Sequence, residues 1–152
     1  MSARHLIRRF WWSATARPLG DETREWAHSF LGDGERRLFD RMSPADQRHH
    51  VQVARRFREG LAGDIPNEWT AAALLHDVGK LVSGLGLGGR VMATVIPIRW
   101  GDGRLSRYHR HEDIGASLAR ASGSAASTVA LIGRWPDAPR NALAALDAAD
   151  DL

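Results

Sequence analysis

The sequence predicts an all-α protein, a compact bundle of about seven to nine helices. Two observations carry this prediction: apolar residues recur at helical spacing along most of the 152-residue chain, and helix-capping and helix-stopping residues separate these stretches at short intervals. Residues 90–98 are rich in β-branched side chains and would form a strand in isolation, but the flanking helices favour a core helix. The length fits a single domain, which we divide into an N-terminal helical extension (1–42) and a core (43–152).

The composition limits the chemistry that the chain can perform. Because it contains no cysteine, a disulfide, a thiolate nucleophile and a cysteine-type zinc site are excluded, and any metal must be bound by histidines and carboxylates. No apolar run approaches the roughly 20 residues that span a bilayer. The pair Arg8-Arg9 resembles part of a twin-arginine export signal but lacks the following apolar region, so we expect a cytoplasmic protein with no membrane partner.

The charge is mildly basic. The net charge is +3, and the pI is near 10.4 because 20 of the 21 basic residues are arginines, which hardly titrate. We interpret this as a solvated arginine surface. The alternative is a non-catalytic helical module that binds a nucleotide or nucleic acid, supported by the arginine-rich stretches 4–9 and 55–58 and by six tryptophans.

The N-terminal extension is predicted to contain short packing helices. Residues 2–16 alternate apolar and arginine residues at helical spacing and predict an amphipathic helix. Asp21 is a suitable cap for the next helix, which places Trp26 and Phe30 on one side. A turn at residues 32–34 then leads into a helix over 35–42.

Ser43-Pro44 is the clearest helix start in the sequence, since it combines a hydroxyl cap with proline at the first helical position. The helix should run to about Leu61. On this helix His50 falls near the centre of the apolar face and His49 at its edge. A central histidine is often a satisfied core residue, whereas an edge histidine can point along the seam between helices, so the pattern leaves open which of the two serves a site.

The stretch 71–80 predicts half of a metal site. Asn67 is a good N-cap for this helix, and Gly79 is expected to stop it in a left-handed turn. His76 and Asp77 should therefore lie in its last turn. Adjacent residues diverge by about 100° within a helix, but at its end both side chains can reach one ion.

The next segments connect and extend the bundle. The glycine-rich stretch 83–89 follows a helix and lacks dinucleotide-loop spacing, so we interpret it as a flexible connection. A basic loop is expected at Arg99, Arg104, Arg107 and Arg110. His109 should open the following helix, and because His109 and His111 are two residues apart, at most one of them should serve a site.

Two further helices are predicted near the C-terminus. One starts at Ser124 and stops at Gly133 and Pro136, and Pro139 begins the last. On the last helix Asp147 and Asp150 share one face. Acidic residues near a helix C-terminus oppose the helix dipole, so their position indicates either a metal ligand or a frayed acidic tail.

Together these motifs resemble the HD-domain superfamily of metal-dependent phosphohydrolases, an all-helical fold. The resemblance covers residues 43–152. The stretch 43–54 is similar to the family's first histidine element, in a register that selects His49, and His76-Asp-Val-Gly-Lys80 is similar to the central signature. Tyr108–Ala116 resembles the His-Glu-x-x-Gly-Ala segment, and Ala148-Ala-Asp150 resembles the closing Ala-Asp. The use of arginine in place of lysine suits the small stand-alone HD proteins of actinobacteria.

The resemblance implies one divalent cation, Mn²⁺, Fe²⁺, Ni²⁺, Co²⁺ or Mg²⁺, held by His49, His76, Asp77 and Asp150. Members with two metals carry a further histidine near the position of Ile132-Gly-Arg-Trp135, where this chain has no side chain that binds a divalent cation. We therefore expect a site for one metal.

The resemblance also implies hydrolysis of a small phosphorylated metabolite, such as a nucleotide phosphomonoester or phosphoanhydride. Asp77 would orient the attacking water, and Lys80, the sole lysine of the chain, would neutralise phosphoryl oxygens or protonate the leaving group. Arg107 and Arg110 would clamp the phosphate, and His111 would either hydrogen-bond the substrate or lie near a second, weaker metal.

Overall fold

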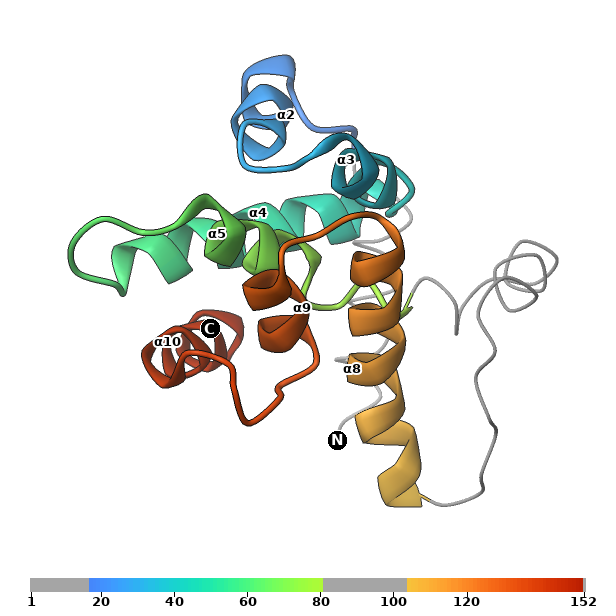
Figure 1. The fold of residues 1–152 in the computed structure, drawn as a ribbon. Helices are drawn as coiled ribbons and strands as arrows, with labels where there is room; N and C mark the ends of the chain where they lie inside the picture. Colours follow the sequence, from blue (N-terminus) through green and yellow to red (C-terminus); the bar gives the residue numbers. More distant parts are fainter. Residues whose placement is uncertain (1–16, 81–103, 152) are drawn as a thin grey trace, which may run out of the picture.

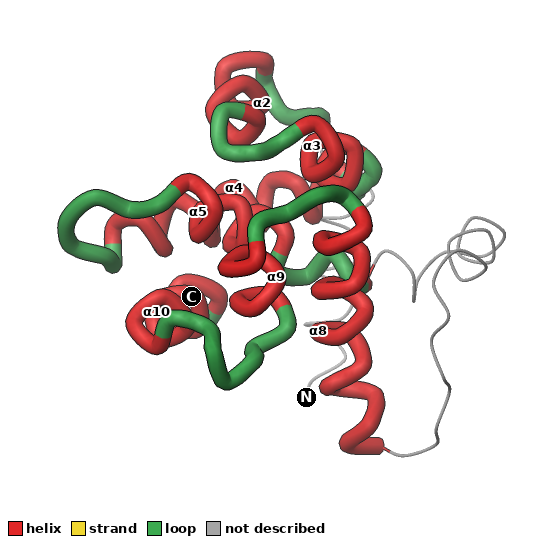
Figure 2. Tube along the Cα trace, viewed as in Figure 1, coloured by secondary structure: helices red, strands yellow, loops and turns green. Residues whose placement is uncertain are grey.

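The computed structural model describes residues 17–80 and 104–151, with the backbone alone described for 104–110. These residues form seven helices and no strand, which confirms the all-α prediction (Figures 1 and 2). The helices are α2 (Asp21–His28), α3 (Asp33–Asp40), α4 (Pro44–Glu59), α5 (Asn67–Leu75), α8 (Arg104–Ala121), α9 (Ala126–Ile132) and α10 (Arg140–Asp150). The predictions for residues 2–16, 83–89, 90–98 and Arg99 lie outside the described residues.

Helices α4 and α5 form the centre of the bundle. Helix α4 packs against α5 and α10, while α9 packs against both α5 and α8. Helix α5 is apolar on all sides, and its residues from Thr70 to Leu75 are buried, as expected for a helix enclosed by others. The core therefore surrounds the helix that leads directly into His76.

The start of α4 is the one that the sequence predicts. The Ser43 side chain accepts a hydrogen bond from the Asp46 backbone N–H, and Pro44 is the first helical residue. Helix α4 buries Val53, Ala54 and Phe57. Its other buried positions include His50, as the helical pattern predicts for the centre of an apolar face.

The two helices of the extension cover one side of the core (Figure 1). The rings of Trp26 and Phe30 meet edge to face at 5.1 Å, and both pack partly buried against the core. Arg55 lies over the Trp26 ring and Arg58 over the Phe30 ring, each guanidinium about 5 Å from the ring centroid. Two arginines of the 55–58 stretch are thus engaged in packing the extension onto α4.

Gly79 permits a close approach between two backbones, not the left-handed turn that we expected. Among the described glycines only Gly63 and Gly123 have positive φ. A Cβ atom on Gly79 would lie 2.0 Å from the backbone oxygen of His111 and 2.9 Å from the backbone nitrogen of Gly115. The turn after α5 therefore lies directly on α8, and only glycine fits at this contact.

Several predicted helix boundaries are wrong. Arg104, Arg107 and Arg110 belong to α8 and form no loop, so α8 begins five residues before His109. The cap of α5 is Pro66 rather than Asn67, and the cap of α9 is Ala125, one residue after Ser124. No helix in the described ranges is long and apolar enough to cross a membrane.

Replacing Gly79 with alanine should destabilise the protein by at least about 3 kcal/mol, because the added methyl group would overlap backbone atoms that cannot move without separating α5 from α8. Denaturant unfolding followed by circular dichroism measures this change. Gly60→Ala is the matched control: Gly60 has a φ of −78°, and its added Cβ would meet its nearest atom at 3.4 Å. Similar stabilities for the two variants would contradict the assigned contact.

Candidate metal centre

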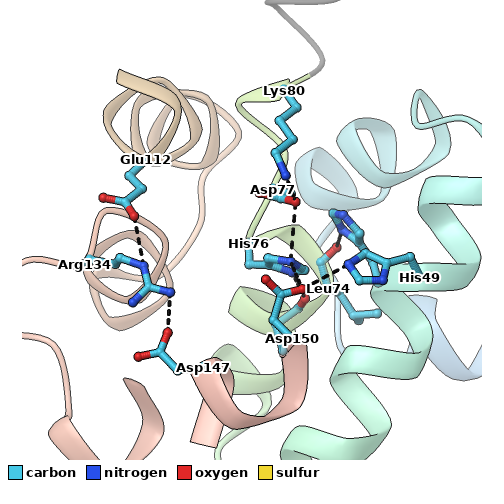
Figure 3. Close-up of polar contacts among 11 residues, drawn as sticks. His49, Leu74, His76, Asp77, Lys80, Glu112, Arg134, Asp147 and Asp150 are labelled. Carbon is cyan, nitrogen blue, oxygen red and sulfur yellow. Dashed lines mark hydrogen bonds and ion pairs between the residues drawn. The ribbon is translucent and has the colours of Figure 1, made fainter. Parts of the chain in front are cut away.

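Three separate helices bring the four predicted ligands together (Figure 3). His49 lies on α4, His76 and Asp77 follow the end of α5, and Asp150 is the last residue of α10. His49 Nε2 lies 3.1 Å from Asp150 Oδ1, and His76 Nε2 lies 3.4 Å from the same oxygen and 3.7 Å from Asp77 Oδ2. Residues more than 100 positions apart in the sequence thus converge on one point.

The end of α5 explains how adjacent residues can share this point. The helix stops at Leu75, and the chain continues in tight turns in which Val78 N–H bonds to the Leu75 carbonyl and Lys80 N–H to the Asp77 carbonyl. These bonds belong to tight turns that follow the regular α-helix. In this stretch His76 Nε2 and Asp77 Oδ2 lie 3.7 Å apart, so both side chains reach the cluster.

The orientation of His76 is the most informative feature of the cluster. Its Nδ1 lies 2.9 Å from the Ala73 carbonyl oxygen, which can only accept a hydrogen bond, so Nδ1 carries the proton. In the neutral ring Nε2 then presents a lone pair. This nitrogen is buried and has no hydrogen-bond partner within the described part of the chain, although carboxylate oxygens lie nearby. A lone pair facing carboxylates is repulsive unless a proton or a metal ion lies between them.

His50 supports His76 from the core. The His50 ring is 3% exposed and donates from Nδ1 to the Leu74 carbonyl at 2.8 Å. This ring packs against the His76 ring at a tilt of 31°, with centroids 4.5 Å apart. Burial lowers the pKa of His50 to about 3, so this ring stays neutral. His49 therefore lies in the cluster next to Asp150, whereas His50 lies in the core and packs against the His76 ring.

The electrostatics show that the cluster favours positive charge. Burial by itself lowers the pKa of His76, but the Asp150 and Asp77 carboxylates outweigh it and raise the pKa above 6.5. The contact with His76 holds the pKa of the Asp150 carboxyl well below its usual range. Burial by itself would raise the pKa of Asp77, but His76 and Lys80 outweigh burial and lower this pKa. Burial and the neighbouring His76 lower the pKa of His49.

The donor atoms fit a divalent cation in type and spacing. Ligand atoms of His49, His76 and Asp77 all lie within 4.8 Å of one another, and Asp150 contacts both histidines. Two donors held at about 2.1 Å from one ion lie about 3.0 Å apart in octahedral and about 3.4 Å apart in tetrahedral coordination. The His76 Nδ1–H bond to a carbonyl is the usual way in which a protein orients a metal-binding imidazole.

A cavity of about 130 Å³ adjoins the cluster. His76, Asp77 and Asp150 line it, and so does Lys80, whose ammonium group is hydrogen bonded to Asp77 Oδ2. His111 lines the same cavity, and its Nδ1 is buried without a hydrogen-bond partner among the described residues. Two of the predicted substrate-contacting residues, Arg107 and Arg110, lie on α8 in the part where side chains are not described.

Sequence reasoning missed Arg134. Glu112, its partner, lies in the middle of α8 and lines the cavity. Arg134 was considered only as a residue that binds no metal. It lines the cavity too, with its Nε 3.0 Å from Glu112 and its Nη2 bonded to Asp147 (Figure 3). No periodicity or spacing in the sequence signals this contact.

The comparisons with known proteins returned no match: no family model fits the chain, and no curated protein or solved structure is significantly similar to it. A fold alone does not determine a function, because unrelated sites occur on the same architecture. The assignment therefore depends on the residues and the geometry of the site.

In the metal-free protein the pKa of His76 should fall when Asp150 is replaced with asparagine. The Asp150 charge stabilises the imidazolium, and without it the burial of His76 opposes protonation more strongly. NMR titration of the histidine ring protons measures the change. Asp147→Asn is the matched control, because Asp147 lies on the same helix but bonds to Arg134. An unchanged His76 pKa in Asp150→Asn would refute the assigned contact.

Proposed function

We propose that this chain is a divalent-metal-dependent phosphohydrolase of the HD-domain type that acts in the cytoplasm on a small phosphorylated metabolite, such as a nucleotide. The single observation that carries the proposal is the buried Nε2 of His76, which faces two carboxylates beside a second imidazole, an arrangement that a divalent cation between these groups would satisfy. The His-Asp-Val-Gly-Lys sequence at this position and the all-helical fold support the same class.

His49, His76, Asp77 and Asp150 would hold the metal. Two neutral imidazoles and two carboxylates balance the charge of a divalent cation and suit Mn²⁺, Fe²⁺, Ni²⁺, Co²⁺ or Mg²⁺. When bound, such an ion polarises a phosphoryl group and lowers the pKa of its water from about 15.7 towards about 7. One metal per chain is expected, because these four residues form a single cluster.

Asp77 and Lys80 would carry the remaining steps. Asp77 belongs to the cluster and also lines the cavity, so its carboxylate can orient the attacking water. As the new oxygen–phosphorus bond forms, the bond to the leaving group breaks. The Lys80 ammonium, held at Asp77, can neutralise the phosphoryl oxygens or give a proton to the leaving oxygen.

Measuring metal binding distinguishes the proposed metal site from a cluster of histidines and carboxylates that binds no metal. The protein refilled with Mn²⁺ or Co²⁺ should hold about one ion per chain by elemental analysis after dialysis, and His76→Ala should lower its metal affinity at least about 100-fold, since even the outer partners of a metal site contribute 10- to 100-fold. His28→Ala is the control, because His28 also pairs with an aspartate, Asp40 at 3.0 Å, but away from the cluster. Equal metal retention in the two variants would exclude the assigned site.

Hydrolysis tests the activity itself. The metal-loaded protein should release phosphate from a generic phosphatase substrate or from nucleotides, and Asp77→Ala should retain less than about 1% of this rate while its circular dichroism spectrum stays helical. The expected loss follows from removing a ligand and a water-orienting group together. Equal rates in the two proteins would disprove the proposal. Salt-dependent binding to DNA or RNA without a metal requirement would instead indicate the non-catalytic module.

A further inference from the structure

Arg134 has a backbone conformation that favours glycine. Its φ is 52°, and it is the only residue other than glycine with a positive φ in the described ranges. It directly follows Gly133, the cap of α9, at the kind of helix end where glycine is usual. This conformation is unfavourable for a residue with a side chain, because its Cβ approaches the following carbonyl oxygen. Such residues persist where the surrounding contacts hold them, and they are common at functional sites.

Two carboxylates fix the guanidinium of Arg134. Glu112 from α8 pairs with its Nε at 3.0 Å, and Asp147 from α10 bonds to its Nη2 (Figure 3). The side chain of Glu112 is only 18% exposed, so this pair is partly shielded from solvent. An arginine held from two helices is preorganised, and little side-chain entropy is lost when it binds a ligand.

The same guanidinium borders the cavity of the candidate metal centre. In Figure 3, Arg134 and Glu112 lie on one side, and His76, Asp77 and Asp150 lie on the other. With neutral histidines, the three carboxylates that line the cavity and Asp147, which bonds to Arg134, exceed the two cations Lys80 and Arg134 by two charges. A divalent cation bound by the cluster would neutralise this excess. The net repulsion of an anion would then be removed, and Lys80, Arg134 and the metal would be the positive groups that it meets.

The size of the cavity limits what can enter it. Its volume of about 130 Å³ is well below the roughly 300–1,000 Å³ of sites that enclose a whole small molecule. A phosphate group is no larger than a few water molecules, each of which occupies about 30 Å³ in the liquid. The space bounded by the described residues therefore accommodates an anionic head group of the size of a phosphate.

We propose that Arg134 binds the phosphoryl group of the substrate from the side opposite the metal ligands, and that Glu112 and Asp147 position its guanidinium. This inference rests on the proposed function and specifies it. The substrate presents a terminal phosphate to Lys80 and Arg134, while the rest of the molecule stays outside the cavity. The planar fork of arginine suits two phosphate oxygens at once.

The test uses inorganic phosphate as the probe and the Mn²⁺-loaded full chain. Arg134→Gly removes the guanidinium and suits the positive φ, so the local backbone should keep its conformation. Isothermal titration should show phosphate binding weakened on the order of 10- to 100-fold, the range for a lost hydrogen bond to a charged group. Arg134→Lys should recover part of the affinity, because it keeps the charge but loses the fork.

Arg140→Met is the matched control, because Arg140 is an exposed arginine at the start of α10 and does not line the cavity. It should bind phosphate as the wild type does, and elemental analysis should find the same metal content in all the variants. Unchanged phosphate affinity in Arg134→Gly would overturn the proposal. Loss of metal from Arg134→Gly would also overturn it, because Arg134 would then support the metal ligands instead.

If the proposed function is wrong, the measurements will differ from those expected when only the role of Arg134 is wrong. If the wild-type protein retains no metal, or retains metal but hydrolyses no phosphate ester, the proposed enzyme class is wrong and the inference about Arg134 is overturned with it. If the wild type does both and only the Arg134 variants behave like the control, the enzyme class stands and the role of Arg134 is refuted.

Discussion

The structure around the site depends on one buried imidazole. His76 is fixed on one edge by its hydrogen bond to Ala73 and on one face by the ring of His50, so its Nε2 can point only at Asp77 and Asp150. A buried nitrogen next to carboxylates is costly unless a proton or a metal ion lies between them. The packing of α4 against both α5 and α10 brings these groups together, so the same contacts build the core and the cluster.

The close approach at Gly79 connects this cluster to the other half of the site. Because the turn after α5 lies on the backbone of α8 at His111, the side chains of α8 border the cavity that Asp77 and Lys80 line. A larger residue at position 79 would separate the two walls. Glycine is therefore required here because the turn and α8 lie so close together. Its backbone conformation is ordinary and does not itself require glycine.

The features that depend on local chemistry could be predicted from the sequence. The contacts between elements that are distant along the chain could not. The cap at Ser43 follows from its hydroxyl group and the proline after it, and the burial of His50 and the edge position of His49 follow from helical periodicity; all three are observed. The clash at Gly79 was not predictable, because it involves a backbone atom 32 residues away. The contacts of Arg134 were not predictable either, because its partners lie on α8 and α10 and its positive φ is unusual for an arginine.

Helix α10 links the two sides of the cavity, because Asp147 and Asp150 lie on one face but contact different partners. Asp150 faces the imidazoles of His49 and His76, whereas Asp147 bonds to Arg134. Three residues correspond to a rise of about 4.5 Å along a helix, so the two carboxylates hold a fixed spacing. A shift of α10 would therefore move the Asp150 oxygen of the candidate metal centre and the Asp147 partner of the guanidinium together. The spacing between Asp150 and the partner of Arg134 is thus set by a rigid element, as the proposed contact of a metal ion and Arg134 with one phosphoryl group would require.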